Sequence, residues 1–136
     1  MCRSPMAEAI AMVYAPNLKI ISCGIRTLKG YPATKNTQIV CLERGLDLKD
    51  HKSKCDSQSI LNKSLVLCMD KKQKETIQKR YKGLEVYLLT EKGTGSLHEI
   101  TDPTGRGINA HRETIISIEN EVKALINNLS DINSII

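Results

Sequence analysis

Two short apolar runs joined by a helical segment constrain the fold of this chain most. Residues 65–69 are five apolar residues in a row, the pattern of a strand buried on both faces of a parallel sheet. Residues 85–89 indicate another strand. Between them, Asp70 can cap a charged helix over residues 71–81, which Gly83 ends. A strand, a helix and a strand in this order favour a layered α/β fold with a parallel sheet.

The remaining segments continue the alternation of helices and strands. Residues 19–23 predict a short buried strand, which Gly24 ends. Gly30-Tyr31-Pro32 opens a predicted helix, and Gly45 lies where a left-handed C-terminal cap is expected. Polar loops are predicted over 47–59, which includes His51, and over 91–101. The apolar face of the second helix is formed by Ala33, Thr37, Val40 and Cys41, and that of the last helix by Ile115, Ile118, Val122, Leu125 and Leu129.

Length and composition limit the classes of protein that fit. The 136 residues predict a single domain over 1–136, with 40% apolar residues to form its core. No apolar run approaches the ~20 residues of a membrane span, and no secretory signal is present. The net charge is +5, but the lysines alternate with acidic residues and lack an aromatic stacking platform, so we expect neither a nucleic-acid nor a membrane partner.

The cysteines indicate a compartment. There are five of them, with no C-x-x-C pair and no regular spacing. This pattern favours free thiols in a reducing cytoplasm over a disulfide framework or a zinc site. We therefore expect a cytoplasmic protein that needs no metal and no cofactor.

The start of the chain predicts an anion site. Ser4 can cap a helix, and Pro5 suits its first position, where a missing N–H costs nothing. Unpaired amides at such a terminus, beside the Arg3 guanidinium, suit a phosphate group. The apolar face of this helix is formed by Met6, Ala9, Ile10, Val13 and Tyr14.

Residues 2–8, Cys-Arg-Ser-Pro-Met-Ala-Glu, resemble the second half of the C-x-G-N-x-C-R-S-P loop of low-molecular-weight protein tyrosine phosphatases. Asp102-Pro103 falls where that family keeps its general acid. Further similar segments, spread over nearly the whole length, are Ser22-Cys23-Gly24, Gly45-Leu46-Asp47 with His51, and Leu67-Cys68-Met69-Asp70. The resemblance implies a small three-layer domain with a parallel sheet.

The resemblance also implies a reaction and its residues. Phosphate monoesters, on a phosphorylated protein or a small molecule, would be hydrolysed through a cysteinyl-phosphate. Arg3 would grip two phosphoryl oxygens, and the amides of Cys2 and Arg3 would hold the remaining charge. Ser4 would donate a hydrogen bond to the thiolate. Asp102 would protonate the leaving group. Inorganic phosphate and vanadate would bind as ligands.

The chain departs from the family pattern at the nucleophile. The family's first cysteine stands six residues before its arginine, four positions ahead of Met1, and none of the five cysteines has an arginine six residues later. We therefore expect a family member shortened at its N-terminus, without its first, central strand and inactive as it stands. The exposed gap in the sheet would favour poor folding or self-association.

A second departure concerns the substrate. Thr104 and Gly105 follow Asp102-Pro103, where the family often has aromatic residues, so phosphotyrosine and phosphoarginine both remain open. Two other functions remain open. One is a member that only binds oxyanions. The other is an arsenate reductase relative, which would need a second cysteine after Cys68, and residues 69–83 contain none.

Overall fold

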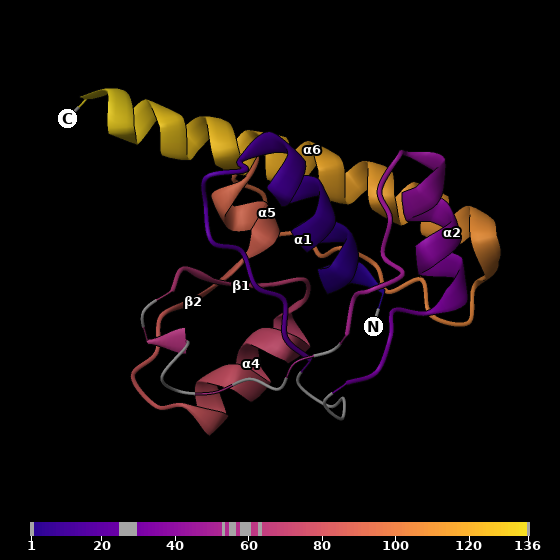
Figure 1. Ribbon diagram of the computed structural model, residues 1–136. Helices are drawn as coiled ribbons and strands as arrows, with labels where there is room; N and C mark the ends of the chain where they lie inside the picture. The colour runs from indigo at the N-terminus through magenta and orange to yellow at the C-terminus, as the bar shows by residue number, and fades with distance from the viewer. Residues whose placement is uncertain are drawn as a thin grey trace.

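The computed structural model describes residues 2–24, 30–52, 54, 57, 61–62 and 64–135. It has three layers, with a two-stranded parallel sheet between helices (Figure 1). Strand β1 (Val66–Cys68) pairs with β2 (Val86–Leu88), with Val66 opposite Val86. The predicted α/β fold with a parallel sheet is thereby confirmed.

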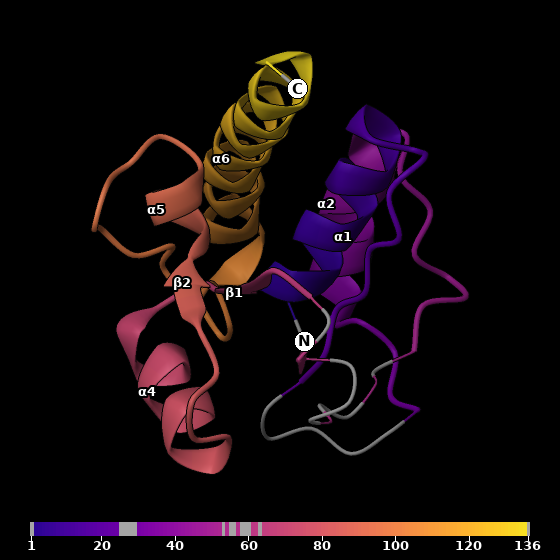
Figure 2. The ribbon, with the colours of Figure 1, turned by 90° about the vertical axis from the view of Figure 1, so that its left-hand side faces the viewer.

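Helices cover both faces of this sheet. Helix α4 (Lys71–Arg80) connects the two strands and lies below the sheet in Figure 1. Above it gather α1 (Arg3–Tyr14), α2 (Lys35–Glu43), α5 (Leu89–Lys92) and α6 (Gly107–Ile135). Figure 2 shows α1 and α2 side by side, with α4 on the far side of the strands. Each face of the sheet therefore has its own set of packed helices.

Two hydrophobic clusters fill the space between the layers. The smaller one, between α4 and the sheet, consists of Leu61, Val66, Cys68, Ile77, Val86 and Leu88. The larger one joins α1, α2 and α6, and includes Met6, Ile10, Val40, Cys41, Ile115, Ile118 and Val122. Side chains alternate along β1, so that Val66 and Cys68 face the smaller cluster and Leu67 packs against the larger one.

The first helix begins two residues earlier than predicted. Helix α1 starts at Arg3, so Cys2 is its N-cap residue and Ser4 lies in the first turn. Proline is accepted there because the first turn has no intrahelical partners for its amides. Val13 and Tyr14 of the predicted apolar face are exposed, and Tyr14 lies below the Lys123 ammonium, 5.3 Å from its ring centroid.

The strand predicted over residues 19–23 does not form. Residues 19–23 form no strand, and Gly24 makes a single bridge in which its N–H donates to the Lys54 carbonyl at 2.9 Å. A strand exists only through pairing, and in the described part of the chain no ladder forms beside residues 19–23. The prediction of a buried strand was therefore wrong, and residues 20–23 are only partly buried.

The second helix ends as predicted but begins later. Residues 30–33 are not helical, and Thr34, with extended backbone, is the residue before the first residue of α2, Lys35. Its predicted face, Ala33, Thr37, Val40 and Cys41, is buried. At the other end, Gly45 has a φ of 76°. The N–H groups of Gly45 and Leu46 donate to Leu42 and Cys41 at 3.0 and 2.9 Å, the pairing of a Schellman cap.

The last third of the chain holds one unexpected helix and one expected helix. The short helix α5 follows β2 directly, within residues predicted as the end of the strand and as loop. Helix α6 runs for 29 residues, and its residues Ile115, Ile118 and Val122 are buried as predicted. Part of the predicted loop over 47–59, including Cys55, lies outside the described residues. None of the helices described has the length and apolar character that crossing a bilayer requires.

Candidate active site

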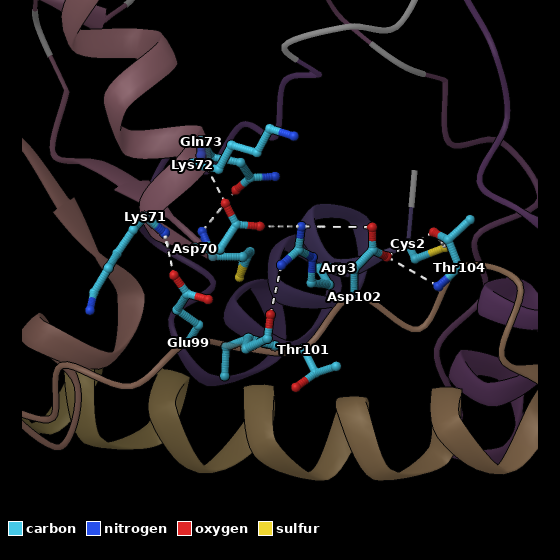
Figure 3. A network of polar contacts seen from close by, with 12 residues as sticks. Cys2, Arg3, Asp70, Lys71, Lys72, Gln73, Glu99, Thr101, Asp102 and Thr104 are labelled. Carbon is cyan, nitrogen blue, oxygen red and sulfur yellow. Dashed lines mark hydrogen bonds and ion pairs between the residues drawn. The ribbon is translucent and has the colours of Figure 1, made fainter.

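Arg3 is the centre of the site. Its side chain is buried, and its Nη1 donates to the Ile100 carbonyl at 2.6 Å. Nη2 lies 2.8 Å from Oδ2 of Asp70 and 3.9 Å from Oδ2 of Asp102. Figure 3 shows the guanidinium between the two carboxylates. The fold thus brings together the two residues predicted as catalytic, Arg3 and Asp102, although 99 positions separate them in the sequence.

Asp70 has a second role that the sequence did not indicate. It caps α4 as predicted, because its Oδ1 accepts from the Gln73 N–H at 2.8 Å. Its other oxygen holds Arg3. One carboxylate therefore connects the first turns of α1 and α4. A signal was available, since Asp70 follows the carboxyl end of β1 and residues there are commonly part of a site in parallel sheets.

Asp102 lies on the loop before α6, with its side chain 54% exposed. Its Oδ1 accepts from both the backbone N–H of Thr104, at 3.1 Å, and the Thr104 hydroxyl, at 2.7 Å. Burial favours the neutral acid, but the two Thr104 hydrogen bonds and the Arg3 charge outweigh it and lower the pKa of Asp102. Without a ligand, this carboxyl is therefore held as a carboxylate.

Cys2 is buried among hydrogen-bonding side chains. Its Sγ lies 3.3 Å from the Thr34 hydroxyl, 3.5 Å from the Thr104 hydroxyl and 3.7 Å from Nε2 of His111. Burial opposes ionisation, but hydrogen bonds with Thr104, Thr34, Thr37 and His111 outweigh it and lower the pKa of Cys2 to about 7. The surrounding hydrogen bonds therefore favour the thiolate form of Cys2.

His111 and Thr34 were not predicted as site residues. His111 lies on the buried face of α6, and its Nδ1 donates to the Gly107 carbonyl at 2.6 Å. Its Nε2 is therefore the nitrogen that faces the sulfur. Thr34 precedes α2 without capping it, because its hydroxyl contacts Cys2 and the Thr37 hydroxyl instead. No local sequence pattern marks either residue, since each reaches Cys2 only through tertiary packing.

Two further sequence-predicted positions lie nearby. Ser4 is half-buried in the first turn of α1, and the described contacts of the site do not include its hydroxyl. Glu8, one turn further along α1, accepts a hydrogen bond from Ser22 and lies 3.7 Å from Nδ1 of His51. The segments around Ser22 and His51 are thus fastened to the helix that carries Arg3.

The cysteine pKa values lead to a testable order of reactivity. Burial, with a small opposing effect from Arg44, raises the pKa of Cys41 to about 11, and burial together with the Asp70 charge raises that of Cys68 to about 12. Only the thiolate reacts with iodoacetamide. We expect labelling of Cys2 to rise through a midpoint near 7, while Cys41 and Cys68 stay unlabelled up to pH 9.

Peptide mass spectrometry after timed labelling of the folded chain measures this order, with the half-exposed Cys23 as an internal reference. Equal labelling of Cys2, Cys41 and Cys68 at pH 8 contradicts this order.

The lowered pKa of Cys2 also makes the stability of the fold depend on pH. Because the folded-state pKa of Cys2 is depressed, its ionisation stabilises the fold above the pKa of an unfolded thiol, ~8.5. This contribution is lost as the pH falls through about 7.

The arrangement suits an oxyanion better than a metal. A buried guanidinium and the N-terminus of α1 supply positive charge and donors, and a carboxyl stands beside them where it can exchange a proton. Among the residues that the structure describes, no group of three or more His, Cys, Asp or Glu side chains is arranged to hold a metal ion.

Comparison with known proteins agrees with this geometry. Residues 1–134 match the model of the family described as low molecular weight phosphotyrosine protein phosphatase. A probable low molecular weight protein-tyrosine-phosphatase, EpsP, from Ralstonia nicotianae is 34% identical over 128 residues, which cover 92% of this chain and 86% of that protein. A protein-arginine-phosphatase from Bacillus subtilis is 29% identical, over 94% of this chain and 89% of that one.

Solved structures show the same likeness. The YwlE arginine phosphatase from Geobacillus stearothermophilus is 25% identical with a TM-score of 0.89, over 96% of this chain and 86% of that one. A YwlE variant described as having a phosphorylated active-site serine in place of cysteine is 28% identical, with a TM-score of 0.90, over 95% and 89% of the two chains. The chain therefore belongs to the low molecular weight phosphotyrosine protein phosphatase family.

Proposed function

We propose that this chain carries the phosphate clamp and the general acid of a protein phosphatase that hydrolyses phosphate monoesters through a cysteinyl-phosphate. Arg3 binds the phosphoryl oxygens, the amides of Cys2 and Arg3 hold the charge that develops, and Ser4 donates to the attacking thiolate. Asp102 protonates the leaving group and then activates water. The observation that carries this proposal is the position of Asp102 beside the buried Arg3 guanidinium, 3.9 Å away.

The reaction also needs a thiolate nucleophile. The YwlE variant with a phosphorylated serine in place of cysteine supports covalent phosphate transfer in that relative. In residues 1–136, no cysteine stands six positions before an arginine. We therefore propose that the polypeptide 1–136 by itself does not turn over substrate, and that it becomes active when an apolar strand ending in Cys-x-Gly-Asn precedes Met1.

Turnover of p-nitrophenyl phosphate by the two polypeptides tests this proposal. We expect negligible hydrolysis by residues 1–136 and clear hydrolysis by the extended chain. The matched control is the same extension with Ser in place of its Cys, which should be inactive. Full activity of residues 1–136 alone would exclude our account of the nucleophile, and an inactive extended chain would exclude the phosphatase assignment.

The phosphoamino acid is a separate question. Relatives of this chain are named as tyrosine phosphatases and as arginine phosphatases. Thr104, next to Asp102-Pro103, supplies a hydroxyl at a position where an aromatic residue would wall a crevice for a phenyl ring. Proteins with phosphotyrosine, a phosphate monoester, and proteins with phosphoarginine, a phosphoramidate, are both proposed substrates, with inorganic phosphate and vanadate as ligands.

A binding function without catalysis is the second candidate. The Arg3 site can hold an oxyanion whether or not a thiolate is present. This function predicts that phosphate binds to residues 1–136, and that the extended chain binds it too without hydrolysing esters. Arsenate reduction is less well supported, because Cys68 is a buried thiol whose pKa burial and the Asp70 charge raise to about 12, and residues 69–83 contain no second cysteine.

The polypeptide 1–136 is also proposed to self-associate. Among the described residues, β1 pairs only with β2, and residues 19–23 form no ladder with it. An unpaired strand edge is a template for pairing with another chain. Light scattering after size-exclusion chromatography should show dimers or larger species at micromolar concentration. A monomer with a reversible, cooperative melt would contradict this. The free thiols of Cys2, Cys41 and Cys68 suit a cytoplasmic location.

A further inference from the structure

The two oxygens of the Asp102 carboxyl have different surroundings. Oδ1 accepts from the N–H and from the hydroxyl of Thr104, at 3.1 and 2.7 Å. Oδ2 is the oxygen that lies 3.9 Å from Nη2 of Arg3. Figure 3 shows Asp102 between Arg3 and Thr104. We propose that Thr104 is a positioning residue, which occupies Oδ1 and thereby places the acid proton of Asp102 on Oδ2, on the side of the anion site.

The donors and acceptors around the carboxyl determine which oxygen carries the proton. An oxygen that accepts two hydrogen bonds takes up a proton only if a donor turns away, whereas Oδ2 keeps space for one. Oδ2 is also the oxygen nearer to Arg3, which grips the phosphoryl group in the proposed function. The proton is therefore held on the oxygen closer to the leaving group. The relation of Oδ2 to the leaving group rests on the proposed function, whereas the placement of the proton on Oδ2 does not.

The Thr104 hydroxyl has a single proton and two neighbours that could accept it. Cys2 Sγ lies 3.5 Å away and the Asp102 oxygen 2.7 Å away. The hydroxyl therefore donates to Asp102, because the shorter contact is the stronger hydrogen bond. Cys2 has other partners in Thr34, Thr37 and His111. In the described contacts, Oδ1 of Asp102 has only the two donors of Thr104.

The charged and titratable groups around Asp102 come from three elements and from the N-terminal ammonium, whose charge also lowers the pKa of the carboxyl. Arg3 on α1 faces Oδ2 and lowers the pKa of the carboxyl. Asp70, before α4, lies on the other side of the same guanidinium. His111 on α6 lies beyond Cys2 and makes its contact with that sulfur. None of these groups approaches Oδ1, so removing the Thr104 hydroxyl changes the surroundings of that carboxyl oxygen and of the Cys2 sulfur, which lies 3.5 Å from the hydroxyl.

The test uses residues 1–136 and needs no catalysis. We would follow the Asp102 carboxyl carbon by ¹³C-detected NMR through an acid titration, in wild type, Thr104→Val and Thr104→Ser. Val removes the donor to the carboxylate, so the pKa of Asp102 should rise toward its usual range, while Ser should keep it at the wild-type position. Thr101→Val, which removes a neighbouring hydroxyl on the same loop, serves as the control and should leave the pKa unchanged.

If Thr104→Val left the pKa of Asp102 at its wild-type value, the proposal would be overturned. It would also be overturned if Thr104→Ser raised that pKa as much as Thr104→Val does. A rise in the Cys2 midpoint without a change at Asp102 would also overturn it, because the hydroxyl would then serve the sulfur. In the extended chain, Thr104→Val should lower kcat about two- to tenfold, the value of one hydrogen bond, and move its alkaline limb to higher pH. If the extended chain proves inactive, only the proposed function fails and the titration still decides the role of Thr104.

Discussion

Arg3→Ala should abolish the binding of phosphate and vanadate to residues 1–136. The guanidinium is the buried cation of the site, and two charge-assisted hydrogen bonds from its planar fork are worth about 1.5–3 kcal/mol each. Their loss corresponds to an affinity lower by ~10²-fold or more. Lysine should restore the charge but not the fork, so Arg3→Lys should bind with intermediate affinity. Isothermal titration calorimetry with each anion measures the effect.

The control for this experiment must separate a lost ligand from a lost fold. Arg112→Ala removes another guanidinium, whose partner is the Glu43 carboxylate at 2.6 Å on the surface, and it should bind anions like the wild type. Circular dichroism should show whether Arg3→Ala remains helical although it leaves Asp70 without its cation. A folded Arg3→Ala chain with wild-type affinity would show that the anion binds elsewhere.

Asp102→Asn should lower kcat of the catalytically complete, extended chain by about 10²–10⁴-fold, the usual contribution of a general acid. KM should change little, because the amide keeps the shape of the carboxyl and its acceptor toward Thr104. The loss should be larger for phenyl phosphate than for p-nitrophenyl phosphate, because the more basic leaving group depends more on a proton. Steady-state rates with the two esters measure this difference.

The pH dependence of kcat tests the role of Asp102 independently. Only the protonated carboxyl can act as the acid, and Thr104 and Arg3 lower its pKa in the empty site. A dianionic phosphate next to Asp102 would raise that pKa again, because like charges disfavour ionisation. The wild-type kcat should therefore decline on the alkaline side, and Asp102→Asn should lose that limb.

Asp47→Asn is the matched control, since Asp47 also accepts from the N–H two residues later, at 2.9 Å, and is exposed on a distant loop. Asp102→Asn with an unchanged kcat would exclude the carboxyl as the acid.

Elements with a clear period or apolar run were predictable from the sequence. The buried residues of α6 recur at helical spacing, and the core strands appear as apolar runs on either side of a capped helix. The strand expected over 19–23 failed because a strand depends on a neighbour, and the pattern of one segment does not reveal whether that neighbour exists. Helix α5 was missed because its four residues are too short to show a period.

The part of the site that the family motifs cover was predictable from the sequence. Arg3 and Asp102 come together as the resemblance implied. The residues that surround Cys2 were not predictable, because Thr34, Thr104 and His111 are 32, 102 and 109 positions away from it. Each of these contacts is a product of packing between α1, α2 and α6 rather than of local sequence.

The carboxylate of Asp70 has a thermodynamic consequence beyond the site. It holds Arg3 with one oxygen and caps α4 with the other, although α1 and α4 lie on opposite faces of the sheet. An oxyanion that takes Nη2 of Arg3 competes with Asp70 for the same donor. Occupancy of the site is therefore linked to the first turn of α4, and by reciprocity a change in that turn alters the affinity for the anion. Amide exchange at Gln73 would report ligand binding from the other side of the molecule.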